Sequence, residues 1–242
     1  MRLKVHSAGI SDPGLKRGVN EDSILVEDNS NLWAVADGMG GHENGAFASG
    51  HTVKCLSGQG FVADFEDAKD LISQRIYAAN QQIWEAGGAQ NAAGTMGTTL
   101  VSLVIRGHEF AVLWVGDSRA YIYRRGGLFQ LSTDHTHVQD LIDEGVLSEE
   151  EAEGHPMSHV LSRALGVQET VRVDIMQDMI DAGDIFLLCS DGLTGPVSEE
   201  AIREIVAKHP LQMAAEMLIK AAHDNGAPDN VSVVLVGIEE DI

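Results

Sequence analysis

Four aspartates stand at the ends of short apolar runs, where a carboxylate is poorly hydrated. Three come within two residues after such a run and one comes two residues before it: Asp37, Asp117, Asp191 and Asp229. If the runs are strands of shared sheets, these carboxylates converge at one end of the protein and repel one another. A hard divalent cation removes that repulsion, and oxygen ligands without a Cys/His set favour Mg²⁺ or Mn²⁺. Glu21 and Asp22 precede a further run and would add oxygen ligands or hold a cation's water.

Asp37 ends the apolar run of residues 32–36 and is followed by Gly38, Gly40 and Gly41. Glycine has no Cβ, so the backbone there can bend sharply and approach a ligand closely. Taken alone, this stretch also fits a strand-to-loop corner with a hydrated aspartate, because Asp-Gly is a common turn dipeptide. The same pattern recurs at Asp117 and Asp191, and this repetition favours a metal-binding cleft.

Arg17 lies five residues before Asp22 and has two interpretations. Its planar guanidinium would bind a phosphate held near a metal, or it would form a structural ion pair with a carboxylate. Four histidines are further potential ligands, although single histidines near helix starts are more often caps or surface residues. They are His135, His137, His155 and His159.

The hydrophobic periodicity predicts the elements that position these residues. Strands are predicted over residues 3–10, 23–26, 32–36, 95–105, 110–115, 120–123, 171–176, 184–189 and 231–236. Helices are predicted over residues 44–56, 65–85, 198–207 and 210–223 and within 132–144, with Gly87 and Gly88 ending the second helix. Ser148 and Glu151 have the spacing of a capping box on a short helix. The least regular stretch, residues 145–166, is interpreted as a mobile flap over one face.

Composition limits the class of protein. A chain of 242 residues without a linker or an internal repeat suits one domain over residues 1–242. The 37 Asp and Glu outnumber the 16 Lys and Arg, and a net charge of −21 argues against nucleic acid and anionic membranes as partners. No signal peptide or membrane span is expected. Cys55 and Cys189 lie in apolar contexts, so we expect reduced thiols and a cytoplasmic location.

Seven motifs, in this order along the chain, resemble those of one known family. They are Arg-Gly-Val-Asn-Glu-Asp (17–22), Val-Ala-Asp-Gly-Met-Gly-Gly-His (35–42), Met-Gly-Thr-Thr-Leu (96–100), Val-Gly-Asp-Ser-Arg-Ala-Tyr (115–121), Ser-Arg-Ala-Leu-Gly (162–166), Cys-Ser-Asp-Gly-Leu-Thr (189–194) and Pro-Asp-Asn-Val-Ser (228–232). The chain closely resembles bacterial metal-dependent Ser/Thr protein phosphatases of the protein phosphatase 2C (PPM) family. The resemblance implies an α+β fold, a four-layer α-β-β-α sandwich in which helices flank two antiparallel sheets.

The resemblance also implies a role for each candidate site residue. Asp37 would bridge two Mn²⁺ or Mg²⁺ ions, with the Gly38 carbonyl on one of them. Asp191 and Asp229 would complete the other ion's site, and Glu21 and Asp22 would bind directly or through water. Asp117, with Asp191, would serve a weaker third ion. Arg17 would bind the substrate phosphate.

The implied reaction is hydrolysis of phosphoserine and phosphothreonine in proteins, by a metal-bridging hydroxide that attacks phosphorus in line. The leaving alkoxide needs a proton, and Met39 stands where eukaryotic members carry a histidine. His42 and metal-bound water are the two candidate donors. The implied partners are phosphoproteins and a cognate Ser/Thr kinase, and a monomer is the default. Two alternatives stay open: a catalytically weak phosphoprotein-binding member, and an acidic cation-binding β-protein without catalytic activity.

Overall fold

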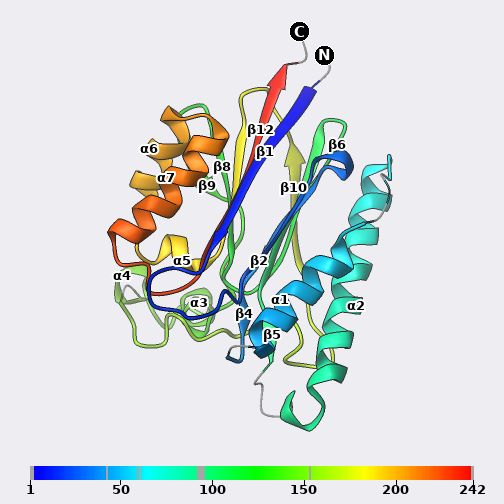
Figure 1. Cartoon of the computed structure of the whole chain (residues 1–242), viewed down its shortest axis with the longest axis vertical. Helices are drawn as coiled ribbons and strands as arrows, with labels where there is room; N and C mark the ends of the chain where they lie inside the picture. Colours follow the sequence, from blue (N-terminus) through cyan, green and yellow to red (C-terminus); the bar gives the residue numbers. More distant parts are fainter. Residues whose placement is uncertain are drawn as a thin grey trace.

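Ten strands form two antiparallel sheets that pack face to face (Figure 1). The computed structural model describes residues 3–41, 43–58, 60, 62–91, 96–152 and 154–240. The first sheet has the order β1 (Leu3–Asp12), β12 (Val231–Glu240), β11 (Ile185–Cys189), β8 (Arg119–Arg124) and β9 (Gly127–Gln130). The second has the order β10 (Asp174–Met179), β7 (Glu109–Val115), β6 (Leu100–Arg106), β3 (Leu32–Ala36) and β2 (Ser23–Glu27).

Helices cover the outer face of each sheet and complete four layers. The first sheet is covered by α6 (Glu199–Lys208) and α7 (Leu211–Asp224), and the second by α1 (Glu43–Leu56) and α2 (Phe65–Asn91). The predicted α+β sandwich is therefore confirmed. Among the residues that the structure describes, no helix combines the length and apolarity needed to cross a membrane.

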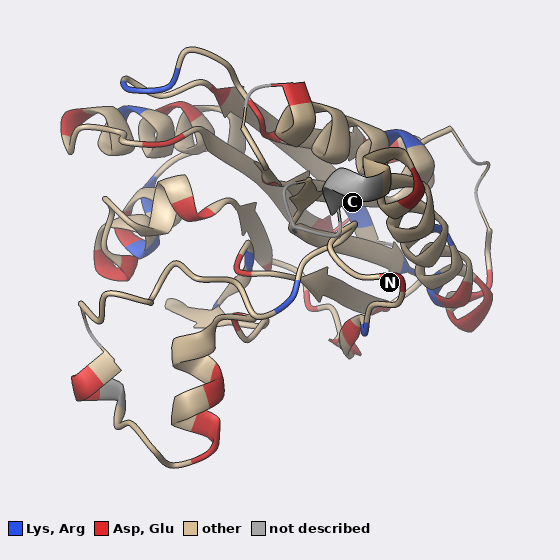
Figure 2. Cartoon of the chain, turned by 90° about the horizontal axis from the view of Figure 1, so that it is seen from below, with Lys and Arg blue, Asp and Glu red and all other residues tan. Residues whose placement is uncertain are grey.

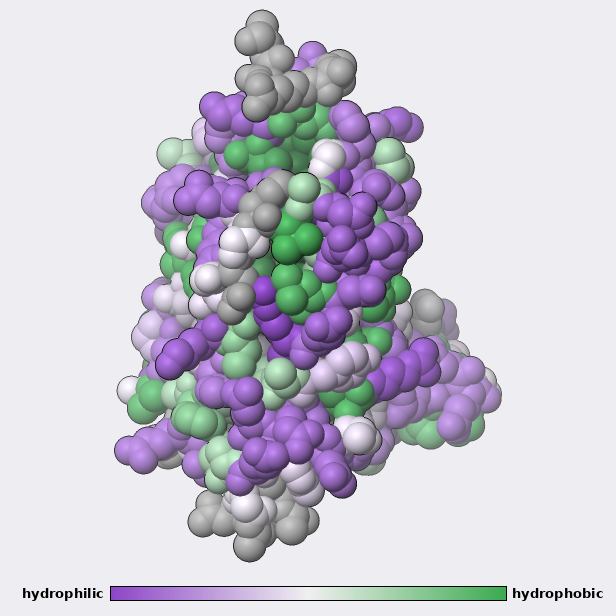
Figure 3. Space-filling model, turned by 90° about the vertical axis from the view of Figure 1, so that its right-hand side faces the viewer, coloured by the Kyte–Doolittle hydropathy of each residue, from purple (hydrophilic) through white to green (hydrophobic). Residues whose placement is uncertain are grey.

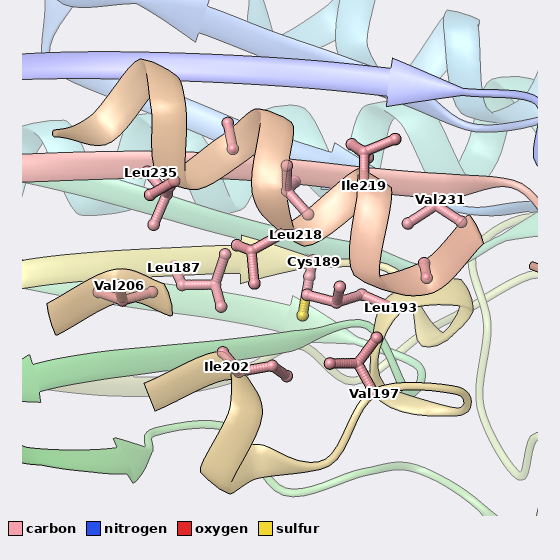
Figure 4. Packing of buried hydrophobic residues seen from close by; sticks show 14 of the residues in the cluster. Leu187, Cys189, Leu193, Val197, Ile202, Val206, Leu218, Ile219, Val231 and Leu235 are labelled. Carbon is pink, nitrogen blue, oxygen red and sulfur yellow. The ribbon is translucent and has the colours of Figure 1, made fainter. Parts of the chain in front are cut away.

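Three apolar clusters lie between the four layers. The cluster between the sheets includes Phe110 and Phe186, whose rings meet edge to face with centroids 4.7 Å apart. A second cluster joins β3, β6 and β7 to α1 and α2. The third joins β11 and β12 to α6 and α7 and contains Cys189 (Figure 4). Burial raises the pKa of this thiol to about 12, and both cysteines are free, as the sequence predicts.

Local capping explains where several helices begin. The Ser198 side chain accepts a hydrogen bond from the backbone of Ala201 and begins α6. The predicted capping box is present at α4 (Glu149–Ala152), where Glu151 accepts from Ser148 while its own backbone N–H donates to Ser148. A third helix in this region, α3 (His137–Asp143), begins at a Thr136 cap.

Several predicted boundaries are wrong, and pairing explains two of them. The predicted strand over residues 95–105 is two strands, β5 (Gly97–Thr98) and β6, separated at Thr99, and its first residue lies outside the described residues. β5 pairs with a short β4 (Gly38–Met39), which the sequence did not predict. β10 starts three residues late, because its pairing with β7 sets its limits.

The regular helix of α2 ends at Gly87 and Gly88 as predicted, because Gly88 has non-helical backbone angles, and a short helical segment continues to Asn91 beyond this kink. Two other departures are local. A one-turn helix, α5 (Asp191–Thr194), directly follows β11 and was not predicted. A short 3₁₀ turn, η1 (Asp28–Ser30), connects β2 to β3.

Candidate metal centre

Sheet topology brings the strand-end aspartates together. β3 and β7 each pair antiparallel with β6, so they run in the same direction and end at the same edge. Asp37 follows β3, and Asp117 follows β7 where the chain crosses to the other sheet. β11 and β12 are antiparallel neighbours, so Asp191 after β11 lies near Asp229 before β12.

A cavity of about 560 Å³ lies at this edge. Its lining includes Arg17, Glu21, Asp37, Gly38, Asp117, Asp191 and Asp229. These are all but two of the candidate residues: Asp22 lies beneath the cavity, 8% exposed, and His42 lies outside the described residues. Figure 2, which views the molecule from below, shows the segment with α3 and α4 protruding from the body with acidic residues on it.

The buried carboxylates raise one another's pKa by electrostatic repulsion. Burial raises the pKa of Asp37 well above its ordinary range, and repulsion from Asp22, Asp191, Asp117 and Asp229 raises it further. Burial and repulsion from Asp229 also raise the pKa of Asp191, while a hydrogen bond with Asp37 opposes that rise. A divalent ion bound among these carboxylates would offset their mutual repulsion.

Asp117 behaves in the same way at the junction of the two sheets. Burial, followed by repulsion from Asp191 and Asp134, raises the pKa of Asp117 to about 7. Asp134 is itself held by Arg119, whose guanidinium donates to both carboxylate oxygens at 2.7 to 3.1 Å. Asp134 is therefore committed to an ion pair, and Asp117 keeps its carboxylate for another partner.

Asp22 supplies a direct test of whether a cation fits. Its Oδ2 accepts hydrogen bonds from Ser190 at 2.8 Å and Ser232 at 2.7 Å, whereas its buried Oδ1 has no partner. Burial raises the pKa of Asp22 to about 6, and the two serine hydrogen bonds limit the rise. An orphaned carboxylate oxygen close to the carboxylates of this cavity fits a hard divalent cation or its water.

The side chains are not yet arranged as a finished coordination shell. Within the described ranges, no three His, Cys, Asp or Glu side chains form a group ready to hold a metal ion. Asp37 is hydrogen bonded to Asp191, and Arg17 Nη2 lies 2.7 Å from Asp229 Oδ2.

The main chain of Asp37 is fixed by two threonines that the sequence analysis passed over. Thr98 Oγ1 and the Thr99 backbone N–H each donate to the Asp37 carbonyl at 2.8 Å. The Asp37 backbone N–H donates to Thr99 Oγ1 at 3.0 Å, and that hydroxyl lies 2.6 Å from the Ser118 hydroxyl. Thr99 thus links the backbone at Asp37 to the residue after Asp117. The feature of the sequence that could have indicated this role is the pair of adjacent polar residues, Thr98 and Thr99, inside an apolar run.

The loop that carries Arg17 is held against the start of β12. The Asn230 side chain accepts from the Glu21 backbone at 2.8 Å and donates to the carbonyls of Pro13 at 2.9 Å and Val19 at 3.1 Å. Gly14 has a φ of +71°, and a Cβ there would lie 2.0 Å from the Asp229 carbonyl. Asn230 was another positioning residue that the sequence analysis did not single out.

Close backbone packing places Gly38 beside the start of α1. A Cβ on Gly38 would lie 2.2 Å from the Gly45 carbonyl oxygen and 2.5 Å from that of Glu21. Its backbone N–H donates to the Glu21 carbonyl at 3.2 Å. The absence of a side chain at Gly38 is therefore a packing requirement, as the glycine-rich turn suggested.

The other histidines divide into structural and surface roles. His135 is buried and hydrogen bonded, His137 is the first residue of α3, and His155 accepts a hydrogen bond from the backbone of Met157. His159 lies in the predicted flap and lines the cavity. Because its neighbours Val160 and Leu161 also line the cavity, the flap segment does border the site, while its mobility stays a prediction.

Comparison with known proteins places this arrangement in a family. The family model described as protein phosphatase 2C matches residues 16–227. The chain is 38% identical to the serine/threonine protein phosphatase PstP of Mycobacterium tuberculosis over 239 residues, which is 98% of this chain and 45% of that protein. It is 36% identical to the serine/threonine phosphatase stp of Listeria monocytogenes, covering 96% of this chain and 95% of that protein.

A solved structure supports the same assignment. The catalytic domain of PstP in complex with two manganese ions superposes with a TM-score of 0.84 at 35% identity, covering 99% of this chain and 100% of that one. The fold is that of the bacterial serine/threonine protein phosphatases. This chain belongs to the protein phosphatase 2C family.

Proposed function

We propose that this protein hydrolyses phosphoserine and phosphothreonine in proteins, with Mn²⁺ or Mg²⁺ bound in the carboxylate cavity. The observation that carries the proposal is the shared cavity of Arg17, Asp37, Asp117, Asp191 and Asp229, drawn from both sheets. The manganese ions in the PstP catalytic domain support a metal-dependent site. A phosphate monoester brings negative charge, which this acidic cavity can hold only with cations present.

The placement of the residues supports the ligand roles that the family resemblance implies. Asp37 lies among the other carboxylates and would bridge two ions, with the Gly38 carbonyl beside it. Asp191 and Asp229 would complete one site. Glu21 lines the cavity and Asp22 lies beneath it, so these two would bind an ion directly or through water.

Asp117 would hold a weaker third ion together with Asp191, whose charge raises the pKa of Asp117. The bound ions would activate water for attack on phosphorus and neutralise charge on the phosphate oxygens.

Arg17 would orient the phosphate. Its guanidinium is half exposed at the cavity and now contacts Asp229, so an incoming phosphate can take over its N–H donors once that carboxylate has turned to a cation. A bidentate guanidinium contact fixes the phosphate for in-line displacement.

The leaving Ser or Thr oxygen needs a proton. Met39 lines the cavity and cannot supply one. We keep the two sources that the sequence leaves open, His42 and water within the cavity. They differ in how the pH profile responds to replacement of His42, so kinetics separate them.

The wider setting is also proposed. Phosphoproteins and a cognate Ser/Thr kinase are the expected partners, in bacterial signalling in the cytoplasm. A single domain over residues 1–242 and a monomer fit the molecule. On the side that carries α2, hydrophilic residues separate the hydrophobic ones over most of the face (Figure 3). Large exposed apolar side chains such as Phe47 and Tyr77 belong to different helices there.

The experiment is phosphate release from matched phosphothreonine, phosphoserine and phosphotyrosine peptides in the presence of Mn²⁺ or Mg²⁺. The proposal expects multiple turnovers on the first two peptides. Binding of a phosphothreonine peptide without phosphate release would favour the phosphoprotein-binding alternative. Cation binding without either result would favour the non-catalytic alternative.

A further inference from the structure

His135 holds the residue before Asp117 at two points. Its backbone N–H donates to the Gly116 carbonyl at 3.0 Å, and the Gly116 backbone N–H donates to His135 Nδ1 at 3.0 Å. The His135 side chain is buried, and its residue is 5% exposed. His135 thus binds both backbone polar groups of Gly116, the N–H through its buried imidazole and the carbonyl through its own backbone N–H, which fixes Gly116 more firmly than one hydrogen bond can.

The hydrogen bond from Gly116 indicates which ring nitrogen carries the proton. Because Nδ1 accepts from the Gly116 N–H, the proton of the neutral ring is assigned to Nε2. Nε2 is 3.1 Å from Asp174 Oδ2, to which it then donates, and Arg163 Nη1 also lies 3.1 Å from it. Asp174 is anchored in turn by ion pairs with Arg163 at 3.1 Å and Arg172 at 3.0 Å. Burial and the nearby Arg163 lower the pKa of His135, so its ring is neutral near pH 7.

Gly116 is fixed from its other side by Thr99. Its φ of +106° is open to glycine, and a Cβ there would lie 2.6 Å from Thr99 Cβ. The next two residues are Asp117 and Ser118, and the Ser118 hydroxyl lies 2.6 Å from Thr99 Oγ1. The backbone around Asp117 is therefore held between His135 and Thr99.

His135 is also joined to the cavity rim. Its carbonyl accepts from the Ser162 backbone at 2.9 Å, and the His137 backbone donates to the Val160 carbonyl at 2.9 Å. Thr136 and Leu161 form a β-bridge between the two segments. Because Val160 and Leu161 line the cavity, the segment of residues 135–137 connects the backbone before Asp117 with the cavity rim at residues 160–162.

We propose that His135 is a positioning residue for the weakest cation of the centre, holding Asp117 in place through Gly116 and joining it to residues 160–162. The inference rests on the proposed function, because it assigns a cation to Asp117. The inference depends on Nδ1 of His135 as a hydrogen-bond acceptor. If Nδ1 is removed, the Gly116 N–H loses its partner and the Asp117 carboxylate is no longer held in one place. Partners behind metal ligands typically change metal affinity by about 10- to 100-fold.

The test compares replacements that keep or remove this acceptor. His135→Leu removes it at similar volume, and His135→Gln moves the amide one bond too far out. His135→Asn retains an oxygen near the Nδ1 position, so it is the conservative variant. Asp184→Asn is the matched control, because Asp184 is 2% exposed and bonded to Arg124 at the opposite end of β11. Asp117→Asn removes the charge of the proposed cation ligand itself and so identifies which Mn²⁺ site depends on Asp117.

Mn²⁺ affinity is measured by calorimetry and by the electron paramagnetic resonance signal of free Mn²⁺, with near-ultraviolet circular dichroism as the folding check. We expect His135→Leu and His135→Gln to weaken the weakest Mn²⁺ site at least about tenfold, as Asp117→Asn does. The tighter sites should stay within about twofold. His135→Asn should recover most of the loss, and Asp184→Asn should bind like the wild type. If His135→Leu does not fold, His135→Gln carries the comparison.

Wild-type affinity at the weakest site in folded His135→Leu or His135→Gln would overturn the inference. Equal losses in His135→Asn and His135→Leu would also overturn it, because the acceptor would then be irrelevant. If Asp117→Asn changes no Mn²⁺ site, the inference fails while phosphopeptide turnover still decides the proposed function. If no Mn²⁺ binds to the wild type, the proposed function itself fails.

Discussion

Arg17 Nη2 donates a 2.7 Å hydrogen bond to Asp229 Oδ2, so the proposed phosphate-binding cation and a proposed metal ligand neutralise each other. Both side chains are partly exposed, which keeps such an ion pair weak, at about 0–1 kcal/mol. A divalent ion that recruits Asp229 therefore meets little resistance. Its arrival would free Arg17 at the moment when the cavity becomes able to accept a phosphate.

Replacing Arg17 should separate substrate binding from metal binding. We expect Arg17→Ala to lower kcat/KM on a phosphothreonine peptide by about 10- to 1,000-fold, because the phosphate loses a charged bidentate partner. Mn²⁺ affinity should stay equal or rise, since Asp229 no longer has a competing cation. Arg203→Ala, which removes an exposed ion pair with Glu200, is the control. A parallel fall in Mn²⁺ affinity and activity would contradict this role.

The metal-free protein should become less stable as the pH rises from about 4 to 7. Asp22 has a folded pKa of about 6 and Asp117 of about 7, above an unfolded value of 3.8, so the folded state binds more protons in this interval. The free energy of unfolding therefore falls with pH there, by roughly 3 kcal/mol for Asp22 alone.

Urea unfolding in chelator at pH 5 and pH 7.5 measures this slope. Asp22→Asn should flatten it, and Mn²⁺ should restore stability at pH 7.5 by binding the folded state. The same slope in wild type and Asp22→Asn would show that the pKa of Asp22 is not raised by its surroundings.

Thr99 should matter for activity more than its place between two strands suggests. Thr99→Val keeps the side-chain volume but removes the acceptor for the Asp37 N–H and the contact with Ser118. We expect a loss of about 1–3 kcal/mol in stability and about tenfold in kcat. Ser102→Ala in β6 removes a buried hydrogen bond to Leu113 and should lower stability alone. Equal kcat in the two variants would show that Thr99 does not position Asp37.

His42 can be tested as proton donor through the pH profile. If His42 protonates the leaving oxygen, His42→Asn removes the alkaline limb of kcat and lowers its maximum by about 10²–10⁴-fold. If water in the cavity is the donor, the profile keeps its shape and kcat changes little. Peptides with a better leaving group should rescue the variant only in the first case.

The sequence identified the residues of the site better than their contacts. Asp37, Asp117, Asp191 and Asp229 could be found because each stands where an apolar run ends, and antiparallel pairing then brings strand ends together. The ion pair between Arg17 and Asp229, which are 212 positions apart in the chain, could not be predicted, because the sequence left Arg17 with two interpretations and named no partner.

The same limit applies to positioning residues and strand boundaries. The two hydrogen bonds between His135 and Gly116 follow from tertiary packing that no local pattern encodes. Thr99 interrupts the predicted strand because its N–H bonds to Asp37 instead of continuing a ladder. The start of β10 is likewise fixed by its partner β7 and not by its own composition.

The most direct measurement is phosphate release from a phosphothreonine peptide as Mn²⁺ is added to the metal-free protein, for the wild type and Asp191→Ala. The account predicts no turnover in chelator, saturable activation of the wild type by Mn²⁺, and loss of at least about 100-fold in Asp191→Ala. Asp184→Asn, a change of a buried aspartate at the other end of β11, should retain activation. No turnover by folded, Mn²⁺-saturated wild type, or full activity in chelator, would contradict a metal-dependent phosphatase site in this cavity.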